Sequence, residues 1–538
     1  MKKLALLIMS LTCVLLLSSC NKMIFESNGD GTCSLKSSIG FLEKEIVIPS
    51  ESPKGDTVTQ ISDNAFRYCK GFTSVTIPDS VTSIGDYAFL TCYDLTSVHI
   101  TDLAKWCGIS FDSFSSNPLH CAENLYLNGN LVTELTIPDG VSSISNDAFS
   151  YFRGFTSVTI PDSVLSIGYQ AFCNCRGLTS VTIPDSVRTI EEEAFYYCNH
   201  LETIILPDSV TSMGKNAFST TAYELNKKNW ENNNALYIGN HLIRVTPKFN
   251  DTQITVKYGT RTIADYAFAD YLSDGLTNDN NYVRAVTLPD TITHIGRFAF
   301  YSCSALDNII IPDSVIYIGE DAFYKCTGLE SMTIPFTGES RDATGYKSHF
   351  GYIFGINIKS TSSANEYHYK DAPYYFYTFN IPSGLREITF KGDILKTSVF
   401  RNCKNVTNFV LQKNLSNIGE KAFENCANVT NIIIPESVTS IDDSAFRNCT
   451  NLTNIIIGNN VTSIGNYVFT NCSKLTNVYY KGTAEDWSKI TIGSDNSTLT
   501  NSTRYYYSET KPTAEGNYWY YNENGEIAVW ENSNSTEE

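Results

Sequence analysis

The sequence predicts a repeat solenoid in which short strands build a parallel β-sheet and are joined by short helical turns. The first observation is a unit of 23 residues that recurs along most of the chain: VTIPDSVRTIEEEAFYYC at 181–198 repeats VTIPDSVLSIGYQAFCNC at 158–175 with few changes. The second is that each unit has apolar residues at the same positions. The third is that one unit is too short to bury a core alone, so units must stack. We expect about 14–15 coils.

The repeat unit reads L-T-x-V-x-I-P-D-S-V-T-x-I-G-x-x-A-F-x-x-C-x-x. Position eighteen is Phe in all ten ungapped copies, from Phe89 to Phe469, and position thirteen is Ile in nine of them and Met213 in the other. The copies begin at Phe72, Val132, Phe155, Leu178, Leu201, Val283, Leu306, Val406, Val429 and Leu452. Such columns indicate that every copy adds its apolar residues to one continuous core.

Each unit predicts one short strand followed by two turns. Apolar Val181 and Ile183 flank polar Thr182, which is the alternation of a strand with one buried face. Pro184 ends the strand because it cannot donate to the ladder, and Pro-Asp-Ser supplies turn residues. The Ala-Phe segment is too short for a stable helix, so we expect a single turn that places its Phe in the core.

The repeats and their interruptions divide the chain into four predicted parts. These are a lipoprotein signal peptide at 1–19, a lipid-anchored linker at 20–44, the solenoid at 45–480, and a C-terminal β-rich cap at 481–538. Three insertions interrupt the solenoid, at about 101–131, 224–253 and 337–384.

The N-terminus has the pattern of an export signal. Lys2 and Lys3 precede an apolar run at 4–17, and Leu17-Ser18-Ser19-Cys20 follows. The last four residues resemble the lipobox of bacterial lipoproteins, and this resemblance implies that the thiol of Cys20 carries lipid. An ordinary secretory signal, in which Cys20 merely lies near the cleavage point, is the alternative.

The insertions and the tail contain aromatic segments, and each aromatic segment has two possible roles. HFGYIFG at 349–355 and YYFYTF at 374–379 predict either a contact surface or a packed cover over a degenerate coil. YWYYNENGEIAVW at 518–530 has the Asn-Gly signal of a hairpin, which serves either as a terminal cap or as a carbohydrate-stacking surface. Trp106-Ile109-Phe111 and Trp487-Ile490-Ile492 share one spacing and predict a common device that covers a repeat end.

The charge of the chain restricts its partners. The formal net charge is −18, from 39 basic and 57 acidic side chains, and no long basic run interrupts this balance. The balance argues against nucleic-acid partners and against electrostatic docking on anionic membranes. Contact with a membrane is therefore expected through the lipid anchor only.

Ten of the 16 cysteines occupy one repeat position. Stacking places them in a column beside the Phe column, so we expect buried free thiols that pack as small hydrophobes, in preference to disulfides or a metal site. The column contains Cys69, Cys92, Cys175, Cys198, Cys303, Cys326, Cys403, Cys426, Cys449 and Cys472. Two bridges outside this pattern stay open, between Cys107 and Cys121 and between Cys173 and Cys175.

The sequence predicts no enzyme, no cofactor and no metal. The seven histidines form no close metal-binding spacing, and no Gly-rich phosphate loop or GxSxG motif is present. His120 and Cys121 are the one pair reminiscent of a nucleophile and its base, but adjacent residues rarely face one another.

The outward strand positions of the C-terminal repeats form a candidate binding surface. Positions three and five face outward, and there Ser and Thr of the N-terminal copies give way to Asn and apolar residues. Such a row is a plausible contact patch, although drift among strand-favouring residues produces the same pattern. The candidate residues are Asn408, Asn431, Asn454, Asn477, Val410, Ile433, Ile456 and Tyr479.

The unit L-x-x-V-x-I-P-x-S-V-x-x-I-G-x-x-A-F-x-x-C resembles the BspA-like leucine-rich repeats of bacterial surface proteins, from about Glu45 to Tyr480. The resemblance implies a leucine-rich-repeat fold and a lipid-anchored, extracytoplasmic, surface-exposed protein. It also implies adhesion to host matrix, host cells or other microbes, with proteins or glycans on those surfaces as partners. The alternative function is a structural or assembly role within the bacterial envelope.

Overall fold

The computed structural model describes residues 23–38, 43–231, 234–247, 251–271, 277–278, 282–359, 367–368 and 376–530. The chain divides into two compact units. Unit 1 comprises Met1–Asn232 and Leu236–Ile243, and unit 2 comprises Asn233–Ala235 and Arg244–Glu538. The predicted signal peptide and Cys20 lie outside the described residues. In the part of the chain that is described, no helix has the length and apolar character needed to cross a membrane.

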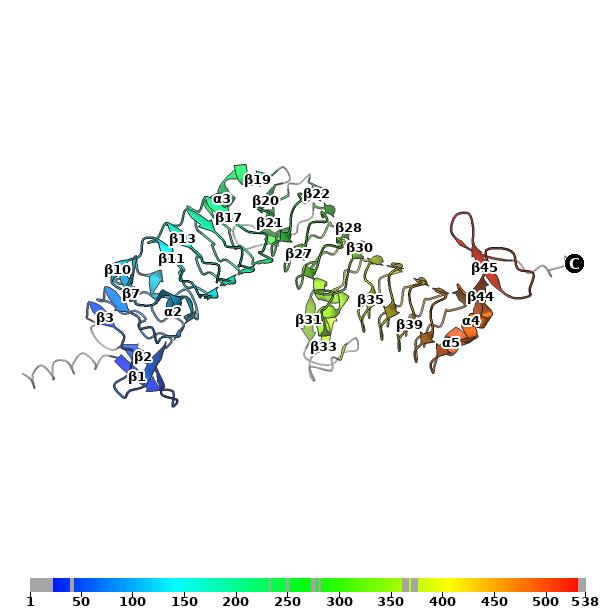
Figure 1. Ribbon diagram of the computed structural model, residues 1–538, viewed down its shortest axis with the longest axis horizontal. Helices are drawn as coiled ribbons and strands as arrows, with labels where there is room; N and C mark the ends of the chain where they lie inside the picture. The colour runs from blue at the N-terminus through cyan, green and yellow to red at the C-terminus, as the bar shows by residue number, and fades with distance from the viewer. Residues whose placement is uncertain are drawn as a thin grey trace, which may run out of the picture. The chain divides into compact units, whose positions relative to one another are not determined.

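Both units are solenoids of parallel strands, as predicted. The described coils number about 19. Among the coils that the sequence did not count are those of β9 and β44, which the sequence placed in an insertion and in the cap and which pair in parallel with repeat strands. Within each unit the strands follow one another from coil to coil (Figure 1).

Each regular coil contributes two strands, whereas the sequence predicted one. Strand β15 pairs in parallel with β13, and the shorter β16 pairs in parallel with β14. The second strand is only two residues long, and it pairs Ile167 with Ile190 of the next coil. Two residues are too few to show a strand period, so the sequence pattern missed it. The Ala-Phe segment forms hydrogen-bonded turns.

Unit 1 contains the sheets β1-β2-β4-β6-β8, β10-β9-β7-β5-β3, β11-β13-β15-β17 and β12-β14-β16-β18. Its elements are β1 (Met23–Ser27), β2 (Thr32–Ser38), β3 (Glu45–Val47), β4 (Thr57–Ile61), β5 (Ser74–Thr76), β6 (Ser83–Ile84), β7 (Ser97–Ile100), α2 (Leu103–Cys107), β8 (Ser110–Phe111), the 3₁₀ helix η2 (Pro118–His120), β9 (Asn124–Leu127), β10 (Asn130–Leu131), β11 (Leu135–Thr136), β12 (Ser143–Ile144), β13 (Ser157–Thr159), β14 (Ser166–Ile167), β15 (Ser180–Thr182), β16 (Thr189–Ile190), β17 (Thr203–Ile205) and β18 (Ser212–Met213). The second insertion holds α3 (Ala222–Leu225), η3 (Lys227–Asn229), β19 (Trp230–Glu231), β20 (Ala235–Ile238) and β21 (His241–Val245).

Unit 2 contains the sheets β22-β26-β28-β30-β34-β36, β35-β37-β39-β41-β43 and β38-β40-β42-β44-β45-β46, with β23, β27 and β29 also paired in parallel. Its elements are β22 (Gln253–Thr255), β23 (Thr262–Ile263), β24 (Asp270–Tyr271), β25 (Thr277–Asn278), β26 (Ala285–Thr287), β27 (His294–Ile295), β28 (Asn308–Ile310), β29 (Tyr317–Ile318), β30 (Ser331–Ile334), η4 (Gly345–Ser348), η5 (Phe350–Phe354), β31 (Ile356–Lys359), β32 (Tyr367–His368), β33 (Phe376–Phe379), β34 (Glu387–Phe390), β35 (Ile394–Leu395), β36 (Asn408–Leu411), β37 (Asn417–Ile418), β38 (Asn431–Ile434), β39 (Ser440–Ile441), β40 (Asn454–Ile457), β41 (Ser463–Ile464), β42 (Asn477–Tyr480), α4 (Ala484–Ser488), β43 (Thr491–Ile492), α5 (Ser497–Asn501), β44 (Thr503–Tyr507), β45 (Tyr518–Tyr521) and β46 (Ile527–Val529).

A column of phenylalanine rings runs through the core of each unit. In unit 1 the rings of Phe172 and Phe195 stack with centroids 5.2 Å apart, and those of Phe195 and Phe218 with centroids 5.3 Å apart. In unit 2 the rings of Phe423 and Phe446 are 5.0 Å apart and nearly parallel. Ring stacking adds to the apolar area that each coil buries, so the column joins neighbouring coils.

The third insertion packs over the core in its described part. Its 3₁₀ helix η5 is buried throughout. Phe354 lies 6.2 Å from Phe323 and Phe350 lies 5.3 Å from Phe400, so the insertion carries the Phe column between two repeats. Of the two interpretations of HFGYIFG given above, the structure therefore agrees with the packed cover. In the second segment, β33 pairs antiparallel with β31, and residues 374–375 lie outside the described residues.

The prediction of a linker at 20–44 is wrong for residues 23–38. Strands β1 and β2 form an antiparallel hairpin, and β2 pairs in parallel with β4, so the segment extends a sheet of unit 1. Cys33 and Leu35 are fully buried there. The segment lacks the repeat consensus, so its alternation did not predict a strand.

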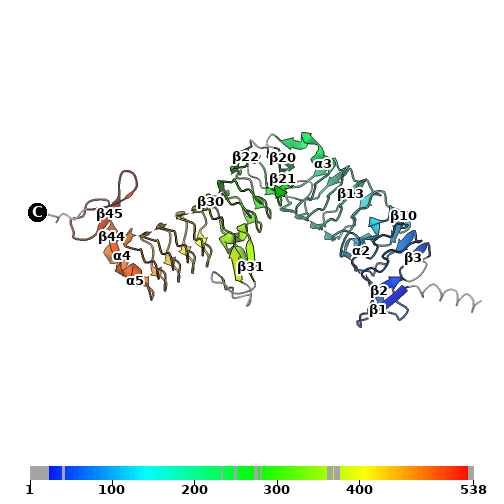
Figure 2. The same cartoon turned by 180° about the vertical axis from the view of Figure 1, so that it is seen from behind.

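The two Trp-x-x-Ile segments form the same device. Helix α2 is followed by β8, which pairs with β6, and helix α4 is followed by β43, which pairs with β41. Helices α4 and α5 lie beside β44 in both views of unit 2 (Figures 1 and 2). The Trp106 indole donates to the carbonyl of Ala148 at 2.9 Å, in a coil beyond the first device. The first device is internal to unit 1, and it lies at the end of two strand ladders, because the sheets that contain β8 and β10 stop there and new sheets begin at β11 and β12.

Replacing a ring of the Phe column is expected to destabilise unit 1. The ring of Phe195 is fully buried between two others, so Phe195→Ala removes stacking on both sides and leaves a cavity. We expect a loss of about 3–5 kcal/mol in the free energy of unfolding, measured by denaturant titration. The control is Tyr93→Ala, whose ring is 80% exposed. Equal effects of the two substitutions would contradict the role of the column.

Asp147 introduces a pH dependence into unit 1. Its side chain is 2% exposed, and its Oδ1 has no hydrogen-bond partner. Burial raises the pKa of Asp147 from 3.8 to about 7. Because the unfolded chain loses this proton first, stability is full below about pH 4 and declines as the pH rises through about 7.

The Asp147→Asn variant is expected to lose this pH dependence. Relative to the parent, its free energy of unfolding should rise between pH 4 and pH 8, and the measurement is denaturant unfolding at both pH values. Asp185→Asn, at an exposed position, is the matched control. A constant difference between Asp147→Asn and the parent would contradict the raised pKa.

Candidate binding surface

The predicted Asn column is a hydrogen-bonded ladder on β38, β40 and β42. Asn431, Asn454 and Asn477 are in register. The Nδ2 of Asn454 donates to the Oδ1 of Asn431 at 2.7 Å, and the Nδ2 of Asn477 donates to the Oδ1 of Asn454 at 2.9 Å. Asn408 instead donates to the Oε2 of Glu387 at 2.8 Å. These bonds hold the amides in one row before any partner arrives.

The apolar column beside the ladder is only half open. Val410 is 38% exposed and Ile433 is 52% exposed, as the prediction required. Ile456 and Tyr479 are 4% and 8% exposed, so the prediction that they belong to a free surface is wrong. We call Asn408, Val410, Asn431 and Ile433 the open strand face.

The cover over Ile456 and Tyr479 comes from the C-terminal hairpin. Trp519 of β45 is fully buried against both residues, and its indole donates to the carbonyl of Tyr480 at 3.0 Å. The ring of Tyr479 also stacks on Tyr505, with centroids 5.2 Å apart. Strand β45 pairs with β44 and β46, and this pairing fixes Trp519 over the sheet. The hairpin therefore caps the outer face of the strands as well as their end.

A second Asn ladder in unit 2 was missed by the sequence analysis. Asn425 donates to Asn402, Asn448 to Asn425 and Asn471 to Asn448, at 2.7, 2.8 and 2.8 Å. All four have φ between 62° and 64°, a left-handed conformation that Asn tolerates better than most residues. The recurrence of Asn at position twenty was the signal. The ladder stabilises the turns and is separate from the open strand face.

The cysteine column consists of thiols that form no disulfide, nine of them buried and Cys69 half-buried. The Sγ of Cys198 lies 3.0 Å from the carbonyl of Phe172, and the Sγ of Cys326 lies 3.1 Å from that of Phe300. Burial raises the pKa of Cys303 and of Cys472 to about 12, so these thiols stay protonated at neutral pH. All 14 cysteines of the described residues are free, including the two pairs left open above. Cys13 and Cys20 lie outside that part.

His120 and Cys121 do not assemble a catalytic pair. The imidazole of His120 packs edge-on against the Tyr151 ring at 4.6 Å, while the Sγ of Cys121 lies 3.6 Å from the carbonyl of Phe89. Burial lowers the pKa of His120 and raises that of Cys121, which disfavours an ion pair between them. Across the described ranges, no three His, Cys, Asp or Glu side chains gather as a metal site would require.

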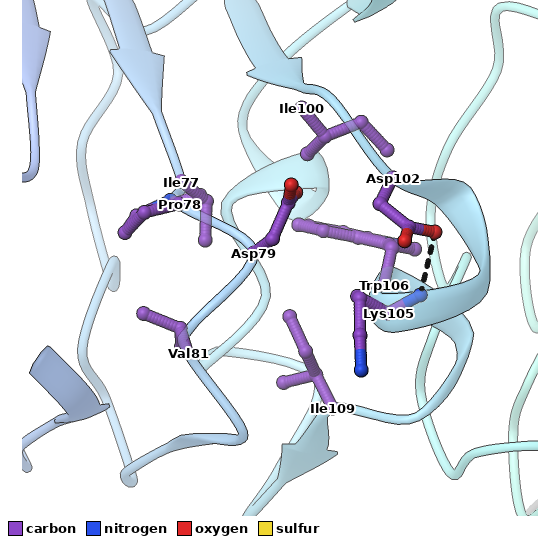
Figure 3. Close-up of a pocket in the computed structure, with 9 residues that line it drawn as sticks. All are labelled: Ile77, Pro78, Asp79, Val81, Ile100, Asp102, Lys105, Trp106 and Ile109. Atoms are coloured by element: carbon purple, nitrogen blue, oxygen red, sulfur yellow. Dashed lines mark hydrogen bonds between the residues drawn. The ribbon is translucent and has the colours of Figure 1, made fainter. Parts of the chain in front are cut away.

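A small cleft lies beside α2 and is filled by its own side chains. Figure 3 shows Trp106 and Ile109 beneath the carboxylates of Asp79 and Asp102. The free volume is about 10 Å³, which is room for one water molecule at most. The Asp102 carboxylate accepts from the backbone N–H of Lys105 at 3.1 Å and so serves as the N-cap of α2. The cleft is a packed junction and offers no room for a ligand.

The BspA-type leucine-rich repeat model matches this sequence. The description of the model is a BspA type leucine rich repeat region of six copies, and its matches cover residues 44–126, 120–250, 247–372 and 372–499. No curated protein matches the sequence.

Solved structures of leucine-rich repeat proteins are also similar. A leucine-rich repeat protein from Bacteroides ovatus has 24% identity over 90% of this chain and 98% of its own, with a TM-score of 0.36. A leucine-rich cell surface protein from Faecalibacterium prausnitzii has 23% identity over 87% and 96%, with a TM-score of 0.24. The pneumococcal vaccine antigen PcpA has 13% identity over 91% and 93%, also with a TM-score of 0.24.

Removing the Trp519 ring is expected to uncover the apolar column. Because Trp519 is fully buried, Trp519→Ala should lower the free energy of unfolding of unit 2 by about 3–5 kcal/mol. It should also increase the fluorescence of an apolar dye, as Ile456 and Tyr479 become accessible. Ile527→Ala, in the same hairpin at 37% exposure, is the control. Unchanged dye binding in a folded Trp519→Ala protein would contradict the capping role.

Proposed function

Because the chain belongs to the BspA-type leucine-rich repeat family, we propose that it is a cell-surface binding protein that adheres to host matrix, host cells or neighbouring microbes. The single observation that carries this proposal is the open strand face. There, two apolar side chains lie exposed beside pre-ordered Asn amides. Exposed apolar groups in a polar frame are the composition of a protein-binding patch.

The construction of the open strand face favours binding. Strand β36 is held by a backbone ladder to β34 and β38 by one to β40, so the face spans the neighbouring edges of two sheets. Asn408 and the Asn ladder are held by hydrogen bonds, so little side-chain freedom remains to be lost on contact. The fixed aromatic cap adjoins the face through β40 and β42. Such a rigid surface suits a folded protein partner better than a flexible one.

The proposed address is the bacterial cell envelope. The lipobox-like Leu17-Ser18-Ser19-Cys20 supports an acyl anchor on Cys20, with residues 21–538 outside the cytoplasm. A structural or assembly role within the envelope is the second candidate function, since the same scaffold serves either. Protease added to intact cells distinguishes the two, because an adhesin is cleaved and a shielded envelope component survives.

The binding test compares the soluble chain at 22–538 with an open-face variant. The variant carries Asn408→Ser, Asn431→Ser, Val410→Thr and Ile433→Thr, and the readout is binding to immobilised matrix proteins and host cells. We expect binding to fall by about tenfold or more, because burying one branched side chain contributes about 1.5–3 kcal/mol. Residues changed this way are exposed strand positions, so the fold should persist.

The matched control changes the same kind of residue in unit 1. Val47→Thr and Ile205→Thr remove apolar side chains that are 64% and 55% exposed on strands β3 and β17. This protein should bind like the parent. Equal binding by the open-face variant would refute the proposed surface, and a folded parent that binds no matrix or cell would favour the structural role.

A further inference from the structure

We propose that unit 2 contains a second, separate binding site, a cleft that holds one sugar unit of a neutral glycan. The cleft lies between the loop that follows β30 and the turn between β34 and β35, and its volume is about 290 Å³. We call it the loop cleft. Its lining includes Phe336, Thr337, Asp342, Phe390, Asp393 and Lys396.

The size of the loop cleft suits a small ligand. Small-molecule sites begin at about 300 Å³, and one sugar ring fills most of such a space. The cleft beside α2, by contrast, has a free volume of only about 10 Å³. The loop cleft is therefore large enough for one ring and too small to enclose a chain, which would have to extend out of it.

The cations of the loop cleft hold its walls together. The Nζ of Lys396 donates to the carbonyls of Arg341 and Ala343 at 2.6 and 2.8 Å, and so ties the loop to the residue after β35. Arg341 donates to the carbonyl of Pro335 at 3.1 Å. Two of the three N–H donors of the ammonium are thus already used. The cleft is pre-formed, and Lys396 is largely committed to its structure, whereas Arg341 keeps further N–H donors for a ligand.

The oxygen atoms of the loop cleft remain available. Asp342 and Asp393 are exposed, and within the described part of the chain neither carboxylate has an ion pair or a hydrogen bond. Thr337 is 8% exposed, and its hydroxyl has no partner among the same residues. Carboxylates accept hydrogen bonds only, whereas a hydroxyl also donates. A ligand that presents several hydroxyl groups matches this set.

The base of the cleft is apolar. The rings of Phe336 and Phe390 lie beneath it at 5% and 2% exposure, and Ile394, which is 51% exposed, supplies most of the accessible apolar surface. A Cβ at Gly392 would lie 2.3 Å from the Phe390 ring, so a larger residue there would displace the ring from the wall. Sugar rings carry an apolar C–H face opposite their hydroxyl groups. The combination of apolar carbon and free acceptors therefore favours a sugar over a uniformly polar molecule.

The charges of the cleft favour a neutral ligand. Arg341 and Lys396 lie on the same lining as Asp342 and Asp393, so an anion meets two carboxylates and an amine meets two cations. The charge of either ligand would be only partly compensated by the cleft, so its burial would cost free energy. A neutral polyol has no charge to bury and avoids this cost. The loop cleft shares no residue with the open strand face, so this inference does not depend on the proposed adhesion.

The test uses the soluble chain at 22–538 and neutral monosaccharides as probes. Saturation-transfer NMR with glucose, galactose, mannose and N-acetylglucosamine identifies a binder, and titration gives its affinity. We expect at least one to bind the parent, and Asp342→Ala with Asp393→Ala to weaken it by about tenfold or more. Asp162→Ala with Asp185→Ala, two exposed carboxylates in unit 1, should bind like the parent.

A second variant keeps the test independent of the carboxylates. Ser340→Trp places a large ring in the cleft and should abolish binding, with circular dichroism and the unfolding midpoint confirming the fold. The proposal is overturned if no neutral sugar binds the folded parent or if binding survives both cleft variants. It is also overturned if a charged amine or acid binds more tightly, or if the open-face variant loses the sugar.

Discussion

The structure depends on hydrogen bonds that each coil makes with the next coil. The N–H of Phe195 donates to the carbonyl of Ala217 at 2.8 Å, and the N–H of Gly214 donates to that of Ile190 at 2.8 Å. These bonds occur in strands and in turns alike, so a coil on its own leaves many backbone groups unsatisfied. The 23-residue period keeps these bonds in register from coil to coil, and extra residues are accommodated only where they leave the ladders, as in the three insertions.

The same constraint explains why equivalent residues form columns. When the backbones of successive coils are in register, each side chain contacts the equivalent side chain of the coils before and after it. Phe rings can then stack, and thiols can pack in a column. Ser186 illustrates the point, because its hydroxyl donates at 2.7 Å to the carbonyl of Val164 in the preceding coil. Ser thus provides at this position an inter-coil bond of the kind that an Asn ladder provides elsewhere in unit 2.

The features that differ from the repeat pattern lie where the repeats are interrupted. The C-terminal hairpin places Trp519 over the strands, and the third insertion places Phe350 and Phe354 into the core and a loop beside β35. Insertions can do so because they leave the ladders on either side intact, as the pairing of β30 with β34 across the third insertion shows. The C-terminal hairpin, which covers Ile456 and Tyr479, limits how far the open strand face extends along the outer surface.

The sequence by itself determined the solenoid, its period, the inward Phe and the free thiols. Ten copies in phase leave one arrangement in which the Phe, Ile and Cys columns face inward, so local pattern and tertiary structure agree. Only the tertiary structure decided the second strand of each coil, the burial of Ile456 and Tyr479, and the cleft between residues 335–342 and 390–396. The second strand pairs equivalent repeat positions over only two residues, which is too short for a strand period to show. The other two features arise from contacts between segments that share no repeat, and no periodic signal in the chain records which segments will meet.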